Sequence, residues 1–110
     1  MAGLDPATQT FNSRLMLQGY VYILASKRNG SLYTGVTNNL AARILAHREG
    51  RGSAFTKKYD VKILVWHETY DMVVDAIQRE TSIKRWSRRW KLALIEKENP
   101  DWNDLYETLG

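Results

Sequence analysis

Two strand-like segments that flank a turn signal, within residues 19–37, most constrain the fold. "GYVYILAS" and "SLYTGVT" are rich in aromatic and β-branched residues, and Asn29-Gly30 stands between them. Asn-Gly favours the tight turn of a β-hairpin, because both residues tolerate positive φ angles. The sequence therefore predicts an antiparallel hairpin. Side chains alternate between the faces of a strand, and either register that this turn allows puts Tyr22 and Tyr33 on the same face.

The segments that follow predict a helix, a connection and a third strand. Asn38 or Asn39 can cap a helix, and Gly50 is a suitable C-terminal stop. Residues 51–60 form a polar, cationic connection. Residues 61–70, "VKILVWHETY", alternate well enough for a strand.

Two further helices are expected in the remaining sequence. The first runs from about residue 72 to 85 with Asp71 as its cap, and the second from about 87 to 98. Pro100 ends the second helix, because proline cannot donate the next helical hydrogen bond. The order ββαβαα predicts an α/β protein of the α+β type, with a small three-stranded, mostly antiparallel sheet flanked by helices.

A chain of 110 residues is expected to form one domain with one core. Residues 1–17 show no helical or strand periodicity and are expected to be a flexible leader. Residues 18–98 hold the predicted domain, and residues 99–110 are expected to form an acidic C-terminal tail. The chain has no cysteine, which excludes disulfides, thiolate metal sites and cysteine nucleophiles. No stretch approaches the roughly 18 apolar residues of a membrane span, so we expect a cytoplasmic protein without membrane partners.

The distribution of charge is more informative than the net charge of +4. Residues 83–91, "IKRWSRRWK", hold five cations and no acid, whereas acids dominate the C-terminal end. Trp86 and Trp90 within this segment allow two interpretations. They stack on nucleic-acid bases beside a cationic track, or they anchor the core while the charges around them are solvated.

Several polar residues occupy positions that suggest chemistry. Arg43 and His47 are four apart on the predicted helix and therefore point the same way. Glu80 falls within an apolar stripe of the later helix, where a carboxylate costs free energy unless it is paired. That stripe is formed by Ala76, Ile77 and Ile83. Lys84 offers a simple structural explanation for Glu80, through an i,i+4 ion pair.

Taken together, these residues also suit the cleavage of a phosphodiester. Such a reaction needs a cation for the charge that develops on phosphorus, a metal ligand and a base that activates water. Arg43 can supply the cation as a bidentate clamp, and Glu80 can hold Mg²⁺ through a carboxylate oxygen. Tyr33 is the candidate base.

The spacing of these residues resembles that of a known family. "YVYIL" and "LYTGVT" carry two motif tyrosines 11 apart, Arg43 follows the second by ten residues, His47 comes four later, and Glu80 lies on a downstream helix. This pattern, over residues 19 to about 95, is similar to the GIY-YIG endonuclease superfamily. Segments such as "FTKKY" and "IKRW" look like its small stand-alone bacterial branch.

The resemblance assigns a role to each of the candidate residues. It implies an endonuclease that acts on DNA, in repair or recombination, with one divalent ion, Mg²⁺ or Mn²⁺. Tyr22 matches the tyrosine of the first motif, and Tyr33 matches that of the second, which is a proposed general base. Arg43 matches the arginine that stabilises the transition state, and His47 matches a histidine that orients water or the phosphate. Glu80 matches the ligand of the metal ion.

The sequence departs from the family pattern at a few positions. Tyr20, Val21 and Thr34 replace the name-giving residues, and a metal-site asparagine has no match, with Asn99 only a distant candidate. Because the chain ends soon after the nuclease-like region, we expect recognition of structure and not of sequence. Two alternatives stay open: a nucleic-acid-binding module that keeps the fold without cleavage, and a nuclease that acts on RNA.

Overall fold

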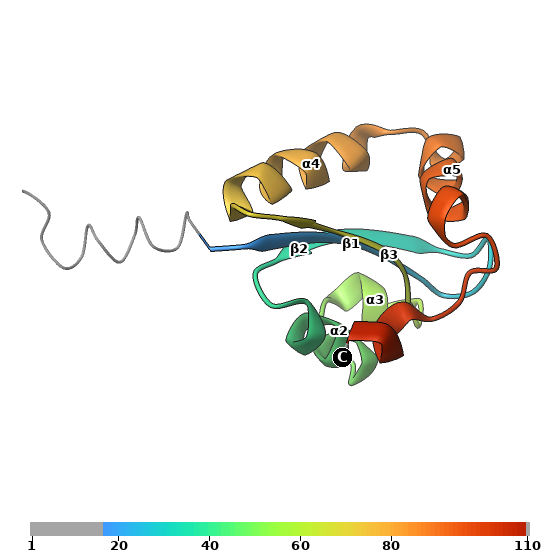
Figure 1. Cartoon of the computed structure of the whole chain (residues 1–110). Helices are drawn as coiled ribbons and strands as arrows, with labels where there is room; N and C mark the ends of the chain where they lie inside the picture. Colours follow the sequence, from blue (N-terminus) through green and yellow to red (C-terminus); the bar gives the residue numbers. More distant parts are fainter. Residues whose placement is uncertain (1–16, 110) are drawn as a thin grey trace, which may run out of the picture.

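A three-stranded antiparallel sheet lies at the centre of the protein (Figure 1). The computed structural model describes residues 17–109, so all of the expected leader except its last residue lies outside the described part. The strands are β1 (Gly19–Ala25), β2 (Leu32–Thr37) and β3 (Ile63–Tyr70), in the order β2-β1-β3. β1 pairs antiparallel with both neighbours, which confirms the predicted α+β class.

Helices cover both faces of this sheet (Figure 1). α4 and α5 lie on one face, and α2 and α3 lie on the other with the C-terminal end of the chain. The helical elements are α2 (Leu40–Arg48), α3 (Ala54–Lys58), α4 (Val73–Arg85), α5 (Arg88–Glu98) and a 3-10 helix, η1 (Leu105–Leu109). α3 and η1 were not predicted, because elements this short show no periodicity.

The helix ends agree only in part with the predicted caps. Asn39 caps α2 by accepting a hydrogen bond from the amide of Ala42, as one of the two predicted alternatives requires. Gly50 follows α2 with a φ of +79°, a conformation that glycine adopts without strain. The prediction that Asp71 caps α4 is wrong: Met72 occupies the cap position, and no side chain makes a capping bond there.

The register of the hairpin sets which residues share a face. Tyr22 lies opposite Gly35, and Leu24 lies opposite Tyr33. This is one of the two registers that the turn allows, and it confirms that Tyr22 and Tyr33 share a face. Because β1 is central and covered on both sides, six of its seven residues are buried, and this explains its nearly continuous apolar sequence.

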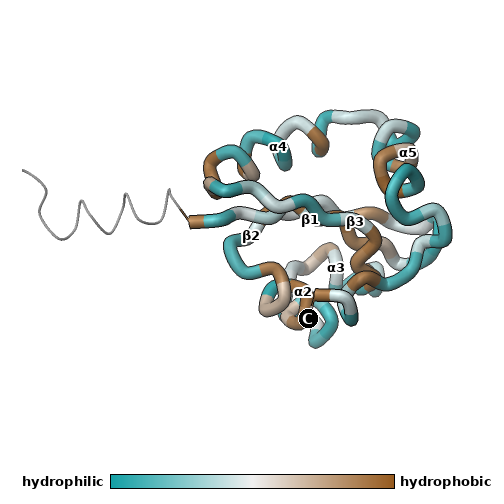
Figure 2. The backbone as a smooth tube through the Cα atoms, viewed as in Figure 1, coloured by the Kyte–Doolittle hydropathy of each residue, from teal (hydrophilic) through white to brown (hydrophobic). Residues whose placement is uncertain are grey.

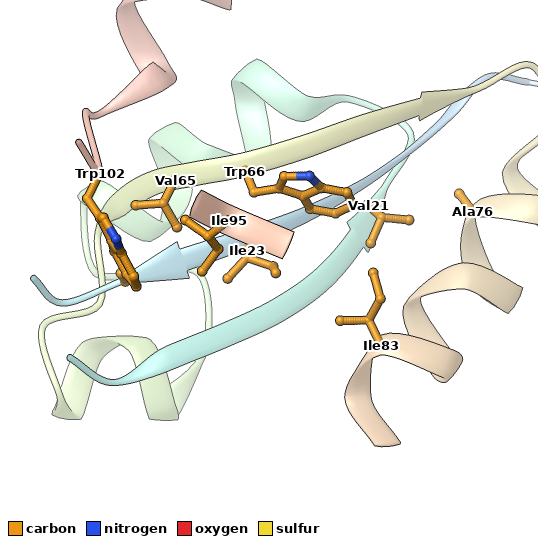
Figure 3. Packing of buried hydrophobic residues seen from close by; sticks show 9 residues of the cluster. Val21, Ile23, Val65, Trp66, Ala76, Ile83, Ile95 and Trp102 are labelled. Atoms are coloured by element: carbon orange, nitrogen blue, oxygen red, sulfur yellow. The ribbon is translucent and has the colours of Figure 1, made fainter. Parts of the chain in front are cut away.

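The larger hydrophobic core lies between the sheet and the α4/α5 layer. Trp66 of β3 packs there with Ile83 of α4 and Ile95 of α5 (Figure 3). The indole N–H of Trp66 donates to Glu98 at 2.9 Å, so its one polar atom is satisfied. Figure 2 shows hydrophobic and hydrophilic stretches alternating along α4, as expected for a helix with one face against a sheet.

The acidic C-terminal segment packs against this domain. Asn99 donates from Nδ2 to the carbonyls of Val65 and Asn103, at 3.0 and 2.9 Å, and its Oδ1 accepts from the Asn103 amide. Trp102 is buried in the larger core. Both ends of the Asn99 amide are therefore engaged in a structural turn, which removes the distant candidate for a metal-site asparagine.

Asp104 links this segment to two other elements. Its Oδ1 accepts from the Leu64 amide of β3 at 3.2 Å, and its Oδ2 accepts from Arg48 of α2 at 2.7 Å. The apolar side chains of η1 pack against the core cluster on the α2 side of the sheet. None of the helices within residues 17–109 has the length and apolar character needed to cross a membrane.

Candidate active site

Tyr22 of β1 is the centre of a buried polar cluster. Its ring lies across Gly35 on the neighbouring strand, where an added Cβ would come within 2.4 Å of the Tyr22 Cζ and Oη atoms. A glycine at this position leaves the space that the phenol fills. The Tyr22 hydroxyl lies 2.9 Å from His47 Nε2 in a buried hydrogen bond. Only 1% of Tyr22 is exposed.

His47, in the last turn of α2, is enclosed by protein atoms. Its Nε2 is bonded to Tyr22, and its Nδ1 lies 3.0 Å from the Thr56 hydroxyl on α3. The backbone of Gly52 closes over the ring, where an added Cβ would lie 1.9 Å from Nδ1. Both ring nitrogens are therefore used within the protein, and the ring has no exposed surface.

Burial and charge together keep His47 neutral. Burial in the first place, and the positive charge of Arg43 in the second, lower the pKa of His47 to about 4 from 6.5. Near neutral pH the ring therefore donates through one nitrogen and accepts at the other. This state suits a residue that fixes the direction of the Tyr22 hydroxyl.

We expect an NMR titration to show the His47 ring neutral down to a pH of about 4. The chain has two histidines, so a His47→Gln variant assigns the signals. In the unfolded chain this histidine takes up its proton near pH 6.5. Stability should therefore fall as the pH drops from about 6.5 to about 4, since the unfolded state binds more protons in that window. A His47 ring that titrates near 6.5 in the folded protein would contradict the buried arrangement.

Arg43 lies one turn before His47 on α2 and faces the same cluster. Its NH2 group donates to the Gly52 carbonyl at 3.1 Å. Hydrogen bonding to the Tyr22 hydroxyl is the main reason why the pKa of Arg43 is raised, and the charges of Tyr22 and Tyr33 add to it. The guanidinium therefore stays positive beside both tyrosines.

Tyr33 is the more accessible of the two tyrosines. Its ring centroid lies 6.3 Å from that of Tyr22 and 5.2 Å from that of His47. On its other side it stacks on Phe55 of α3, with centroids 6.2 Å apart and planes 28° apart. Burial raises the pKa of Tyr22, with a smaller contribution from the charge of Tyr33. Tyr22 therefore holds its proton more firmly than an ordinary tyrosine.

Glu80 approaches from α4, on the other face of the sheet. Its side chain is 13% exposed, and Lys84 Nζ lies 2.7 Å from its Oε2, as the i,i+4 spacing predicts. Its negative charge contributes to the raised pKa of Tyr22, so the carboxylate lies within electrostatic range of the cluster. β2 is an edge strand, and side chains from the two faces can meet around such an edge.

The apolar stripe predicted around Glu80 needs one correction. Ala76 and Ile83 are fully buried, but Ile77 is 47% exposed and lies outside the stripe. Ile77 is three residues before Glu80, and sequence spacing alone does not fix where the edge of a narrow buried stripe falls. Glu80 itself lies at the border of the buried face.

The candidate ligands suit a metal ion whose coordination is completed by oxygen atoms of the substrate. Within residues 17–109 no group of three or more histidine, aspartate or glutamate side chains gathers, and Glu80 is the candidate carboxylate ligand. Mg²⁺ commonly binds through one or two carboxylates, several waters and substrate phosphate oxygens. The residues present fit that mode of binding.

The structure adds partners of the site that sequence reasoning missed. Gly52 and Thr56 lie in the segment that was expected to be a plain connection. Ser53 caps α3 by accepting a hydrogen bond from the Thr56 amide at 3.1 Å. A serine before a short apolar and basic segment is a signal for the start of a helix, and it could have predicted α3. The contact of Gly52 with His47 is made by backbone, which leaves no signal in residue type.

Comparison with known proteins identifies the class. Residues 18–93 match the model of the GIY-YIG catalytic domain, and the chain belongs to this family of nucleases. It is 44% identical over 82 residues to the UPF0213 protein SH2523 of Staphylococcus haemolyticus, covering 74% of this chain and 99% of that one. The UPF0213 protein SSP2268 of Staphylococcus saprophyticus is 41% identical over 78 residues, covering 71% and 94%.

The fold of this protein is also similar to that of a solved structure. The NMR structure of the UPF0213 protein BH0048 from Bacillus halodurans is 31% identical and aligns with a TM-score of 0.50. The alignment covers 79% of this chain and 92% of that protein. These relatives are small stand-alone proteins, as the sequence predicted, and their names specify neither a substrate nor a metal.

Proposed function

We propose that the protein is a metal-dependent endonuclease that hydrolyses phosphodiester bonds in DNA in the cytoplasm, and that it selects strand structure and not base sequence. One observation carries the proposal. The phenol of Tyr22 is held by His47 and faces Arg43, with the ring of Tyr33 alongside and the charge of Glu80 within range. A cation, a protonated phenol, a second tyrosine and one carboxylate match the needs of phosphodiester hydrolysis.

Each residue has a distinct part in this proposal. Arg43 binds the phosphate and stabilises the negative charge that builds up as water attacks phosphorus. Tyr33 is the proposed base because it is the more accessible tyrosine, and in its phenolate form it would accept a proton from the attacking water. Tyr22 keeps its proton and orients the phosphate through its hydroxyl. Glu80 would hold Mg²⁺ or Mn²⁺, and the ion when bound supplies Lewis-acid stabilisation of the phosphate and the leaving oxygen.

His47 takes a different part from the one the family resemblance suggests. A ring that is buried and bonded at both nitrogens does not reach water or phosphate in this arrangement. We therefore propose that His47 is a positioning residue, which acts through the Tyr22 hydroxyl.

Exposed aromatic side chains next to the site support selection of strand structure. Phe55, which stacks on Tyr33, is 41% exposed, and Tyr59 is 47% exposed. Their centroids are 4.8 Å apart, and Lys58 lies 5.3 Å from the centre of the Tyr59 ring. Aromatic rings beside cations bind unpaired bases by stacking, without regard to sequence. We therefore favour DNA with unpaired bases near the cleaved bond.

The direct test compares cleavage of a panel of substrates. Purified protein is incubated with duplex, branched and single-stranded DNA, and with RNA of the same sequences, with and without Mg²⁺ or Mn²⁺. We expect cleavage that requires the metal and is strongest where bases are unpaired. Binding without cleavage under every condition would instead favour the non-catalytic nucleic-acid-binding module, and a preference for RNA would favour the RNA nuclease.

Binding should also depend steeply on salt. Cations are clustered at residues 84–91, where α4 ends and α5 begins, so most contacts are expected to be with phosphates. Affinity for an oligonucleotide should fall at least ~tenfold between about 50 and 200 mM salt, because each neutralised phosphate releases a counterion. Fluorescence anisotropy at several salt concentrations measures the slope. An affinity that is independent of salt, or that differs strongly between unrelated sequences of one shape, would contradict selection by structure.

A further inference from the structure

A hollow beside Tyr33 has no part in the chemistry described above. It lies between the hairpin, α3 and the start of α5, and its volume is about 300 Å³. Its lining residues are Ser31, Leu32, Phe55, Arg88 and Lys91. Ser31 and Leu32 directly precede Tyr33 in the chain, so the hollow opens next to the candidate active site.

Arg88 is fixed at the rim of this hollow. Its NH2 group donates to the carbonyls of Asn29 and Gly30 in the hairpin turn, at 2.8 and 2.7 Å. A guanidinium has five N–H donors, so the Nε and NH1 groups stay available for a ligand. Because the side chain is already held, little conformational entropy is lost when it binds.

Lys91 lies one turn further along α5 and on the same side as Arg88. It is half-buried, and within residues 17–109 neither cation forms an ion pair with a carboxylate. The acids of α5 are engaged elsewhere, since Glu96 and Glu98 accept from the indole N–H groups of Trp102 and Trp66. Two adjacent cations without a counterion favour an anion in the hollow.

Phe55 gives the hollow a second kind of surface. Its exposed ring continues the stack that begins at Tyr33, so a flat apolar group can lie against it. An anion site and an aromatic face side by side match a nucleotide, which joins a charged phosphate to a flat base.

We propose that this hollow is a nucleotide-binding subsite for the nucleotide next to the cleaved bond. Arg88 and Lys91 bind its phosphate, and Phe55 stacks on its base. The inference rests on the proposed function, because it assumes that the strand held at Tyr33 continues into the hollow. The subsite explains how a domain of this size keeps a strand in place beside Arg43.

The test measures binding of a fluorescein-labelled single-stranded oligodeoxynucleotide in chelator-containing buffer, where metal-dependent cleavage is absent. Lys91→Gln should weaken binding at least ~fivefold and lower the salt slope by about 0.7, the value for one phosphate contact with a single strand. Lys97→Gln is the matched control, an exposed lysine on the same helix that does not line the hollow. Its effect should be smaller than twofold, because Lys97 is exposed and lies nearly two helical turns from Lys91, where salt screens much of its charge.

The aromatic part of the subsite has its own pair of variants. Phe55→Leu should weaken binding at least ~fivefold, the lower end of the range for loss of one stacked base. Ile77→Ala removes an exposed apolar side chain of α4 that does not line the hollow, and it should leave binding unchanged. Circular dichroism and thermal unfolding establish that each variant is folded.

The possible outcomes distinguish a failure of the subsite proposal from a failure of the nuclease proposal. If Lys91→Gln and Phe55→Leu behave like their controls while the wild-type protein cuts DNA, the subsite is overturned and the nuclease stands. If the protein cuts nothing but the variants lose affinity as stated, the nuclease proposal fails, and the hollow remains a nucleotide-binding site that serves binding alone. An oligonucleotide that does not bind the wild-type protein overturns the subsite.

Discussion

Glu80→Gln is expected to lower kcat for metal-dependent cleavage at least ~100-fold while the protein stays folded and still binds nucleic acid. Glutamine keeps the size of the side chain and an oxygen acceptor but removes the charge that would hold a divalent ion. Cleavage rates at saturating Mg²⁺, together with anisotropy binding curves, measure the two effects separately.

Lys84→Met is the matched control for this variant. It breaks the ion pair with Glu80, 2.7 Å long in the structure, but leaves the carboxylate in place. An i,i+4 pair on a helix contributes about 0.2 to 0.5 kcal/mol, so Glu80→Gln should lose little stability. Lys84→Met should lose more, because the carboxylate that it leaves unpaired is mostly buried. If Glu80→Gln cuts at the wild-type rate and only stability changes, Glu80 is a structural partner of Lys84 and not a metal ligand.

Arg43→Lys is expected to lower kcat about 100-fold, the lower end of the range for removal of one donor from a transition-state site. Lysine keeps the positive charge but loses the planar, two-pronged geometry that suits a phosphate. It would also lose the bond that Arg43 donates to the Gly52 carbonyl. Single-turnover kinetics with saturating protein measure the chemical step directly.

Arg48→Lys on the same helix provides the comparison for this effect. Arg48 pairs with Asp104 and lies over the ring of Tyr106, so its replacement by another cation should leave kcat unchanged. Equal rates for wild type and Arg43→Lys would show that Arg43 does not contact the reacting phosphate. A loss of activity that tracks a loss of folded protein would be detected by thermal unfolding.

The sequence predicted the sheet, and how several candidate site residues lie relative to one another, because these depend on strong local signals. The alternation of β1 and β2 placed Tyr22 and Tyr33 on one face, and the structure confirms the register. The i,i+4 rule put Arg43 and His47 on one side of α2, where both face Tyr22. These relations follow from strand and helix periods alone.

Contacts between distant segments were beyond sequence reasoning. Thr56 contacts His47 because α3 packs next to α2. A helix of five residues is too short to show a periodic pattern in the sequence. The exposure of Ile77 depends on how α4 is rotated against the sheet, which is decided by tertiary packing. The spacing of Glu80 indicated a half-buried carboxylate, but its position within electrostatic range of Tyr22 depends on the fold.

The packing of residues 99–109 has a consequence for the candidate active site. Asp104 bonds both the β3 backbone and Arg48 of α2, and η1 lies against the cluster that also holds Ile44 of α2. Since an exposed ion pair contributes little, most of the support comes from the apolar contacts of η1. Residues 99–109 therefore support α2, the helix that carries Arg43 and His47. A shortened version that stops after α5 would keep every candidate catalytic residue and yet lose the support that keeps them aligned.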